Sequence, residues 1–129
     1  MPDNYKKVVV IGAGTMGSGI AAHLANSNIP TILLDLPSKD EDKNKISNNA
    51  IVNIKKSDPP LLVERNCLNN IQAGNLEDDF HQISDADWII EAVVERIDIK
   101  HKLCKQIELT RNPNSIVSSN TSTIPLSIL

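Results

Sequence analysis

Two patterns of apolar residues, one typical of strands and one of helices, alternate along the chain. Short runs rich in β-branched residues, which fit buried strands, alternate with segments whose apolar residues recur every three or four positions, as on one face of a helix. The expected strands are residues 7–11, 31–34, 70–73, 88–94 and 115–119, and the expected helices are residues 15–26, 40–56 and 98–110. Strands that alternate with helices through short connections predict an α/β fold, a Rossmann-type doubly wound parallel sheet with helices on both faces.

Residues 37–70 are the least regular part of this pattern. One helix, residues 40–56, is expected there, and it has to end in the segment 57–62 because Pro59 and Pro60 cannot continue a helix. Gly74 is expected to close the third strand. The length of 129 residues suits one domain. The last residues of the chain, 127–129, form an apolar stub where a helix should continue. We therefore interpret residues 1–129 as a fragment, truncated before the last strands of the sheet.

Composition narrows the range of functions. The net charge is −3 and aromatic residues make up 2% of the chain, so neither a polyanion-binding surface nor a base-stacking platform is expected. No apolar run approaches the ~20 residues of a membrane span, and the amino-terminal residues lack the apolar core of a signal peptide. Cys67 and Cys104 lack metal-ligand spacing. We therefore expect a cytoplasmic protein with no nucleic-acid, membrane or metal partner.

Four of the five glycines lie in the segment IGAGTMGSGI, residues 11–20, directly after the first expected strand. Three of them fit the pattern G-x-G-x-x-G. Gly12 is expected to allow the tight turn, Gly14 to let a pyrophosphate approach the backbone N–H groups, and Gly17 to let the helix pack close to the sheet. Gly19 is interpreted as a helix-packing residue. The alternative is a glycine-rich turn without a ligand.

Asp35 supports the ligand interpretation. It ends the second expected strand, about 20 residues after the glycines, where a carboxylate accepts hydrogen bonds from ribose hydroxyls. A carboxylate there repels a 2′-phosphate, so NAD is expected rather than NADP, and FAD is the weaker option. The alternative is a solvated acid in a turn.

Two further segments share the carboxyl edge of the expected sheet. Residues 91–95, EAVVE, end the fourth strand, and residues 118–122, SSNTS, end the fifth, so both face the crevice in which such sheets bind ligands. With VVVIGAGTMGSGIAAHLA, Asp35, GNLEDD and ADWIIE, these segments resemble the NAD-binding domain of the 3-hydroxyacyl-CoA dehydrogenases of fatty-acid β-oxidation. The resemblance is greatest to the long bacterial type, which continues into a helical domain and an enoyl-CoA hydratase-like module.

The resemblance implies an oxidoreductase that oxidises (3S)-hydroxyacyl-CoA to 3-ketoacyl-CoA by hydride transfer to NAD. Ser122 matches the family's active-site serine, which bonds the substrate's 3-oxygen, although a serine there also suits a helix cap. Lys55 and Lys56 lie near where the family meets CoA phosphates, and the alternative is a solvated helix end. The cofactor-binding positions implied are Gly12, Gly14, Thr15, Met16, Gly17, Asp35, Ala92, Val93, Glu95, Lys100 and Asn120. Glu95 and Lys100 also suit a pair of solvated charges.

The family's general base, a histidine in an HFFNP-type motif beyond the serine, does not occur in these residues. His23, His81 and His101 are interpreted as structural or surface residues, with His81 in an acidic loop. The isolated chain is therefore expected to bind NAD but not to turn over substrate. Oligomers are expected to form through a carboxyl-terminal domain outside these residues. Two alternatives stay open: a non-catalytic NAD-binding remnant, and a β-hydroxyacid dehydrogenase of the 6-phosphogluconate type.

Overall fold

The chain forms one sheet of five parallel strands. The structure is a computed structural model, and it describes residues 6–35, 42–56, 62, 65–92 and 97–119. The strands lie in the order β3-β2-β1-β4-β5, and all four neighbouring pairs are parallel. Their bounds are β1 Val8–Ile11, β2 Thr31–Asp35, β3 Ile71–Asn75, β4 Trp88–Glu91 and β5 Ile116–Ser119.

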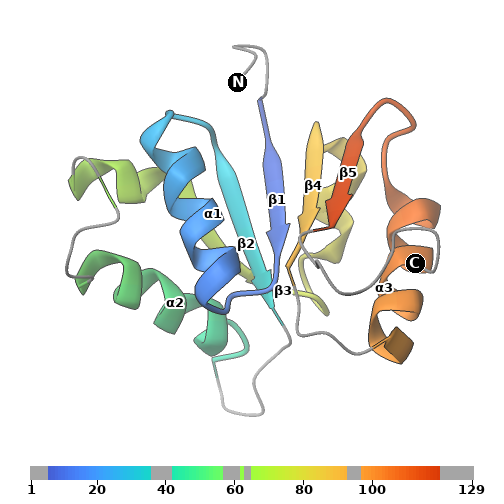
Figure 1. Ribbon diagram of the computed structural model, residues 1–129, viewed down its shortest axis with the longest axis horizontal. Coiled ribbons are helices and arrows are strands. Elements are labelled where there is room, and N and C mark those ends of the chain that lie inside the picture. Colours follow the sequence, from blue (N-terminus) through green and yellow to red (C-terminus); the bar gives the residue numbers. More distant parts are fainter. Residues whose placement is uncertain (1–5, 36–41, 57–61, 63–64, 93–96, 120–129) are drawn as a thin grey trace.

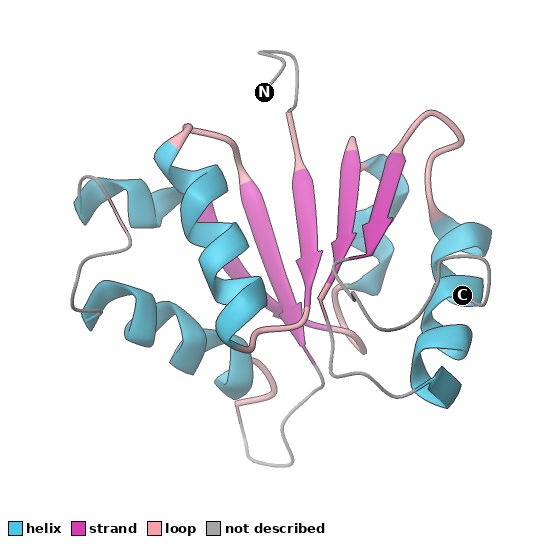
Figure 2. Ribbon diagram, in the orientation of Figure 1, coloured by secondary structure: helices cyan, strands magenta, loops and turns pink. Residues whose placement is uncertain are grey.

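Helices cover both faces of the sheet, as the sequence predicted (Figures 1 and 2). The α-helices are α1 Thr15–Asn26, α2 Lys45–Lys56 and α3 Ile97–Thr110, and the 3₁₀ helices are η1 Arg65–Asn70 and η2 Phe80–Asp85. Val8 and Val10 pack into one core with α1, α2 and η1, whereas Val9 and Ile11 pack into a second core with η2 and α3. A strand buried on both faces has no solvated side, which explains the unbroken apolar run of β1.

Several boundaries differ from the expectation. The second helix begins at Lys45 rather than residue 40, because the side chain of Asp42 accepts a hydrogen bond from Asn44 N (3.0 Å) and organises a turn before it. The third strand continues through Gly74 to Asn75, so the expectation that this glycine closes the strand was wrong. The fourth strand ends at Glu91 rather than at residue 94. In the described part of the chain, no helix is long and apolar enough to cross a membrane.

Gly74 has a packing role instead of a turn role. A Cβ atom added there would lie 2.6 Å from Leu34 Cδ2 and 2.8 Å from Asp79 Oδ2. Its carbonyl oxygen accepts a buried hydrogen bond from Ser47 Oγ (2.8 Å). The third strand therefore needs a residue without a side chain at this point.

The strand order reverses direction between β1 and β4. From β1 the chain adds β2 and then β3 on one side, and it returns to add β4 and β5 on the other. Ile11, the last residue of β1, is in register with Leu34 of β2 and with Glu91 of β4. Open parallel sheets bind their ligands beyond the carboxyl ends of the strands at such a reversal. The candidate site is therefore built from the residues that follow β1, β2 and β4.

Candidate functional site

The turn after β1 depends on glycine at its first position. Gly12 has a φ of 113°, a conformation that residues with a side chain rarely adopt. Its N–H donates to the carbonyl oxygen of Leu34 (2.7 Å), and the N–H of Ala92 donates to the carbonyl oxygen of Ile11 (2.7 Å). The turn is thus held by the strands on both sides of β1.

Gly17 lies in direct contact with the backbone of that turn. A Cβ atom at Gly17 would lie 1.7 Å from the carbonyl oxygen of Gly12 and 3.7 Å from Cβ of Ala92. The expectation that Gly17 permits close approach of the helix is confirmed, with the turn rather than a strand side chain as the neighbour. The helix-packing role expected for Gly19 was wrong, because a Cβ atom there would meet nothing within 4 Å.

Gly14 stands at the start of α1 and leaves the space beyond it open. It is exposed, and a Cβ atom there would meet nothing within 4 Å. As the N-cap residue it offers no side chain to the first N–H groups of α1, and the first turn of this helix contains no acidic residue. Such a terminus carries partial positive charge and unsatisfied donors, which suits an anion such as a pyrophosphate. Met16, in the same turn, is 55% exposed.

Asp35 is joined directly to the glycine turn. It is the last residue of β2, and its carboxylate Oδ2 accepts a hydrogen bond from the N–H of Ala13 (2.6 Å). The side chain is half-buried. A carboxylate can accept several hydrogen bonds at once, so the bond from Ala13 is compatible with another from a ribose hydroxyl. The structure therefore brings Asp35 and the G-x-G-x-x-G turn together, as their spacing predicted.

Part of the predicted site lies outside the described residues. Val93, Glu95, Asn120 and Ser122 belong to segments that the structure does not describe, as do the side chains of Thr15 and Lys100. The described Ala92 follows β4 and lies against Gly17. The roles expected for the other residues stay predictions.

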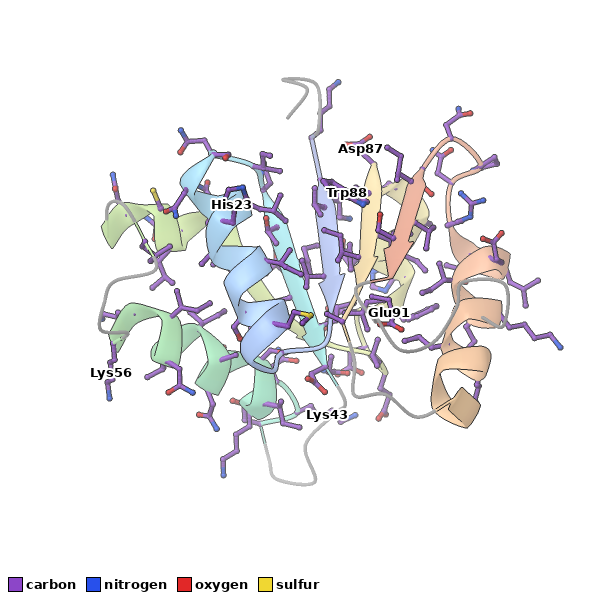
Figure 3. All side chains as sticks on the ribbon, in the orientation of Figure 1. His23, Lys43, Lys56, Asp87, Trp88 and Glu91 are labelled. Atoms are coloured by element: carbon purple, nitrogen blue, oxygen red, sulfur yellow. The ribbon has the colours of Figure 1, made fainter. Side chains whose placement is uncertain are left out.

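Lys55 and Lys56 are not brought to the glycine turn. Both lie in the last turn of α2, where they are exposed and face the negative end of the helix dipole. Figure 3 shows Lys56 at the end of α2 that points away from Lys43 and the carboxyl edge of the sheet. A solvated helix end accounts for these two lysines, and contact with CoA phosphates stays a prediction.

The described histidines lie on the surface. His23 is exposed on α1. His81 is exposed in η2, so its expected place in a loop was wrong. The described residues contain no group of three or more histidine, cysteine or acidic side chains that could hold a metal ion.

Two buried polar residues at the carboxyl edge were not singled out from the sequence. Glu91 ends β4 and is 1% exposed, and Asn75 ends β3 and is also 1% exposed. The only signal for Asn75 was its place in the segment GNLEDD, where it reads as one turn-forming residue among several. Its hydrogen bonds show that it joins separate elements, as described below.

Comparisons with known proteins agree with this geometry. Residues 7–129 match the family described as 3-hydroxyacyl-CoA dehydrogenase, NAD binding domain. The chain is 47% identical over 127 residues to a candidate fatty acid oxidation complex trifunctional enzyme of Rickettsia felis, a match that covers 98% of this chain and 18% of the relative. It is 41% identical over 122 residues to a candidate 3-hydroxyacyl-CoA dehydrogenase of Deinococcus radiodurans, which covers 94% of this chain and 35% of that protein.

A solved structure extends the likeness to three dimensions. The crystal structure of 3-hydroxybutyryl-CoA dehydrogenase from Escherichia coli superposes with a TM-score of 0.78 at 29% sequence identity. The match covers 97% of this chain and 26% of that one. The chain thus spans between about a sixth and about a third of the length of these relatives.

Proposed function

Since the chain belongs to the family of 3-hydroxyacyl-CoA dehydrogenase NAD-binding domains, we propose that it supplies the NAD-binding part of a dehydrogenase of fatty-acid β-oxidation. The reaction is the oxidation of (3S)-hydroxyacyl-CoA to 3-ketoacyl-CoA. The substrate class is acyl-CoA, and NAD accepts the hydride.

One observation carries the NAD assignment: the hydrogen bond between the carboxylate of Asp35 and the N–H of Ala13. It places a carboxylate beside the exposed start of α1, so one ligand can meet both groups. Pyrophosphate oxygens would accept from the first N–H groups of α1 at Gly14, and ribose hydroxyls would donate to Asp35. A 2′-phosphate would meet the negative charge of Asp35 and be disfavoured.

The remaining roles follow the family resemblance. Ser122 would donate its hydroxyl hydrogen to the 3-oxygen of the substrate and stabilise the charge that develops there. Glu95, Lys100 and Asn120 would line the nicotinamide side of the cofactor. The base that removes the hydroxyl proton would be a histidine beyond these residues, and oligomers would form through a following domain. The cytoplasmic location expected from the sequence stays a prediction.

Family membership argues against a dehydrogenase of the 6-phosphogluconate type. The non-catalytic NAD-binding remnant stays open as the second candidate. Both candidates require NAD binding, so cofactor binding is the first property to test.

The test is a titration of the chain with NADH, followed by fluorescence. We expect saturable binding that Gly14→Val abolishes, because a side chain would fill the open space where the pyrophosphate approaches. Asp35→Ala should weaken binding by about 10- to 100-fold, the loss of a hydrogen bond to a charged group.

The control for folding is the melting temperature. Gly14→Val should leave it close to that of the unsubstituted chain, because a Cβ atom at Gly14 meets nothing within 4 Å. If NADPH bound as tightly as NADH, the role given to Asp35 would be wrong.

A further inference from the structure

The segment GNLEDD, residues 74–79, begins with the last two residues of β3 and forms hydrogen bonds with β2 and with the residues before α2. Asn75, the last residue of β3, is buried, and all four hydrogen-bonding positions of its side chain are filled. Oδ1 accepts from the N–H groups of Glu77 (3.0 Å) and Asp78 (2.7 Å). Nδ2 donates to Asn44 Oδ1 (2.7 Å) and to Asp78 Oδ2 (3.2 Å). The side chain therefore shapes its own turn and also reaches residues that precede α2.

The bond to Asn44 is one of several between this segment and the start of α2, beside the buried bond from Ser47 Oγ to the carbonyl oxygen of Gly74 (2.8 Å). Lys43 Nζ contacts Glu77 Oε1 (3.1 Å) and Asp78 Oδ1 (3.8 Å), but these side chains are about half exposed and such pairs contribute little. The bond between Asn75 and Asn44 is half-buried, so breaking it leaves a donor with reduced access to water. Figure 3 shows Lys43 at this edge of the molecule.

The same segment is bonded to Asp35 through the backbone. Asn75 and Asp35 are register partners in the pairing of β3 with β2. The N–H of Leu76 donates to the carbonyl oxygen of Asp35 (2.9 Å). Asp35 is thus held on two sides: its carbonyl oxygen by the residue after Asn75, and its carboxylate by Ala13 of the glycine turn.

We infer that Asn75 is a positioning residue for the ribose-binding carboxylate of Asp35. It acts by fixing the backbone of residues 75–79 against the start of α2. Through the bond from Leu76 to the backbone of Asp35, this sets the direction in which the Asp35 side chain points. This inference rests on the proposed NAD binding and adds a determinant of affinity that does not itself touch the cofactor.

The test is a double-mutant cycle on NADH affinity. Asn75→Ala should raise the Kd for NADH by about 3- to 10-fold, because residues of one hydrogen-bond network are energetically coupled. In the Asp35→Ala background the same substitution should change the Kd by less than about 2-fold, since the group that it positions is gone. Asn44→Ala removes only the acceptor of Asn75 Nδ2 and should behave like a milder Asn75→Ala.

Asn70 provides the matched control. It lies just before the amino end of β3, and its Nδ2 also makes a long-range bond, to the carbonyl oxygen of Ala25 (3.0 Å). Asn70→Ala should lower the melting temperature without changing the Kd for NADH. A purely structural Asn75 would give that same result.

Each outcome decides something. An unchanged Kd in Asn75→Ala, or an equal loss with and without Asp35, would overturn the inference while the proposed function stands. If Asn75→Ala did not fold, the same two readings would be made on Asn44→Ala. If the unsubstituted chain did not bind NADH, the proposed function would be wrong, and the inference would go with it.

Discussion

The amino edge of the sheet, where the strands begin, and the carboxyl edge, where they end, differ in what their polar groups bond. At the amino edge, Asp87 Oδ2 accepts from the backbone N–H groups of Lys6 (2.7 Å) and Lys7 (3.0 Å). Lys7 Nζ in turn donates to Gln82 Oε1 (2.6 Å) and Asp85 Oδ1 (2.5 Å). At the carboxyl edge, Gly14 gives the start of α1 no side-chain cap. Figure 3 shows Asp87 and Trp88 at the first edge and Glu91 toward the second.

This difference separates stability from binding. Side chains at the amino edge satisfy groups of the protein itself, so their removal should change the free energy of unfolding and leave cofactor affinity intact. Gly14 at the carboxyl edge leaves the backbone donors at the start of α1 open to a ligand. Gly17 serves the fold and the site together.

Gly17→Ala should have the largest effect of the single substitutions. Its Cβ atom would lie 1.7 Å from the carbonyl oxygen of Gly12, so the start of α1 has to move away from the turn. We expect the free energy of unfolding to fall by about 3 kcal/mol or more, the range of strong overpacking, and NADH binding to be lost. Denaturant unfolding and NADH titration measure the two effects.

Gly19→Ala is the matched control, two residues further along the same helix. A Cβ atom there meets nothing within 4 Å, and alanine favours a helix by about 0.5–1 kcal/mol over glycine. This variant should be slightly more stable than the unsubstituted chain. Equal losses of stability in the two variants would show that the contact with the carbonyl oxygen of Gly12 does not explain the effect of Gly17→Ala.

Asp87→Ala should have an intermediate effect, on stability alone. Removing a carboxylate that accepts two backbone hydrogen bonds should lower the free energy of unfolding by about 1.5–3 kcal/mol. The Kd for NADH should stay within about 2-fold of its original value, because well-separated sites behave independently. Asp35→Ala is the complementary variant at the carboxyl edge. It also removes an acceptor of a backbone N–H, yet its main effect should be on the affinity for NADH. A weakened affinity in Asp87→Ala would contradict the separation of the two edges.

The sequence predicts the carboxyl edge better than the amino edge, for a physical reason. The glycine turn is local, and the number of residues between Gly12 and Asp35 is that of one strand–helix–strand unit. Sequence spacing alone therefore identifies the turn and the carboxylate. The bond of Asn75 to Asn44 and the bonds of Lys7 to Gln82 and Asp85 join residues far apart in the chain. Such contacts depend on strand order and register, which periodicity does not determine.

The wrong boundary at Gly74 has the same origin. Gly74 is a residue type typical of turns, but it lies inside β3, where Leu34 and Asp79 leave no space for a side chain. The tertiary neighbours of Gly74, not its own preference, therefore explain the glycine at this position.

Asp85 should give the smallest effect, and it depends on pH. The hydrogen bond from Lys7 holds the pKa of Asp85 below its ordinary value of 3.8. A group with a lowered pKa in the folded state stabilises the fold above the unfolded pKa, and this contribution is lost as the pH falls through the folded pKa. Because the Asp85 side chain is 74% exposed, we expect about 0.2–1 kcal/mol.

The measurement compares the unsubstituted chain with Asp85→Asn by denaturant unfolding at several pH values. Asp85→Asn should be the less stable at pH 7, and the difference should shrink below pH 3.8 as the carboxylate becomes protonated. High salt at pH 7 should also reduce it, because salt screens exposed charges. A difference that did not change with pH or salt would mean that the charge of Asp85 does not account for its contribution to stability.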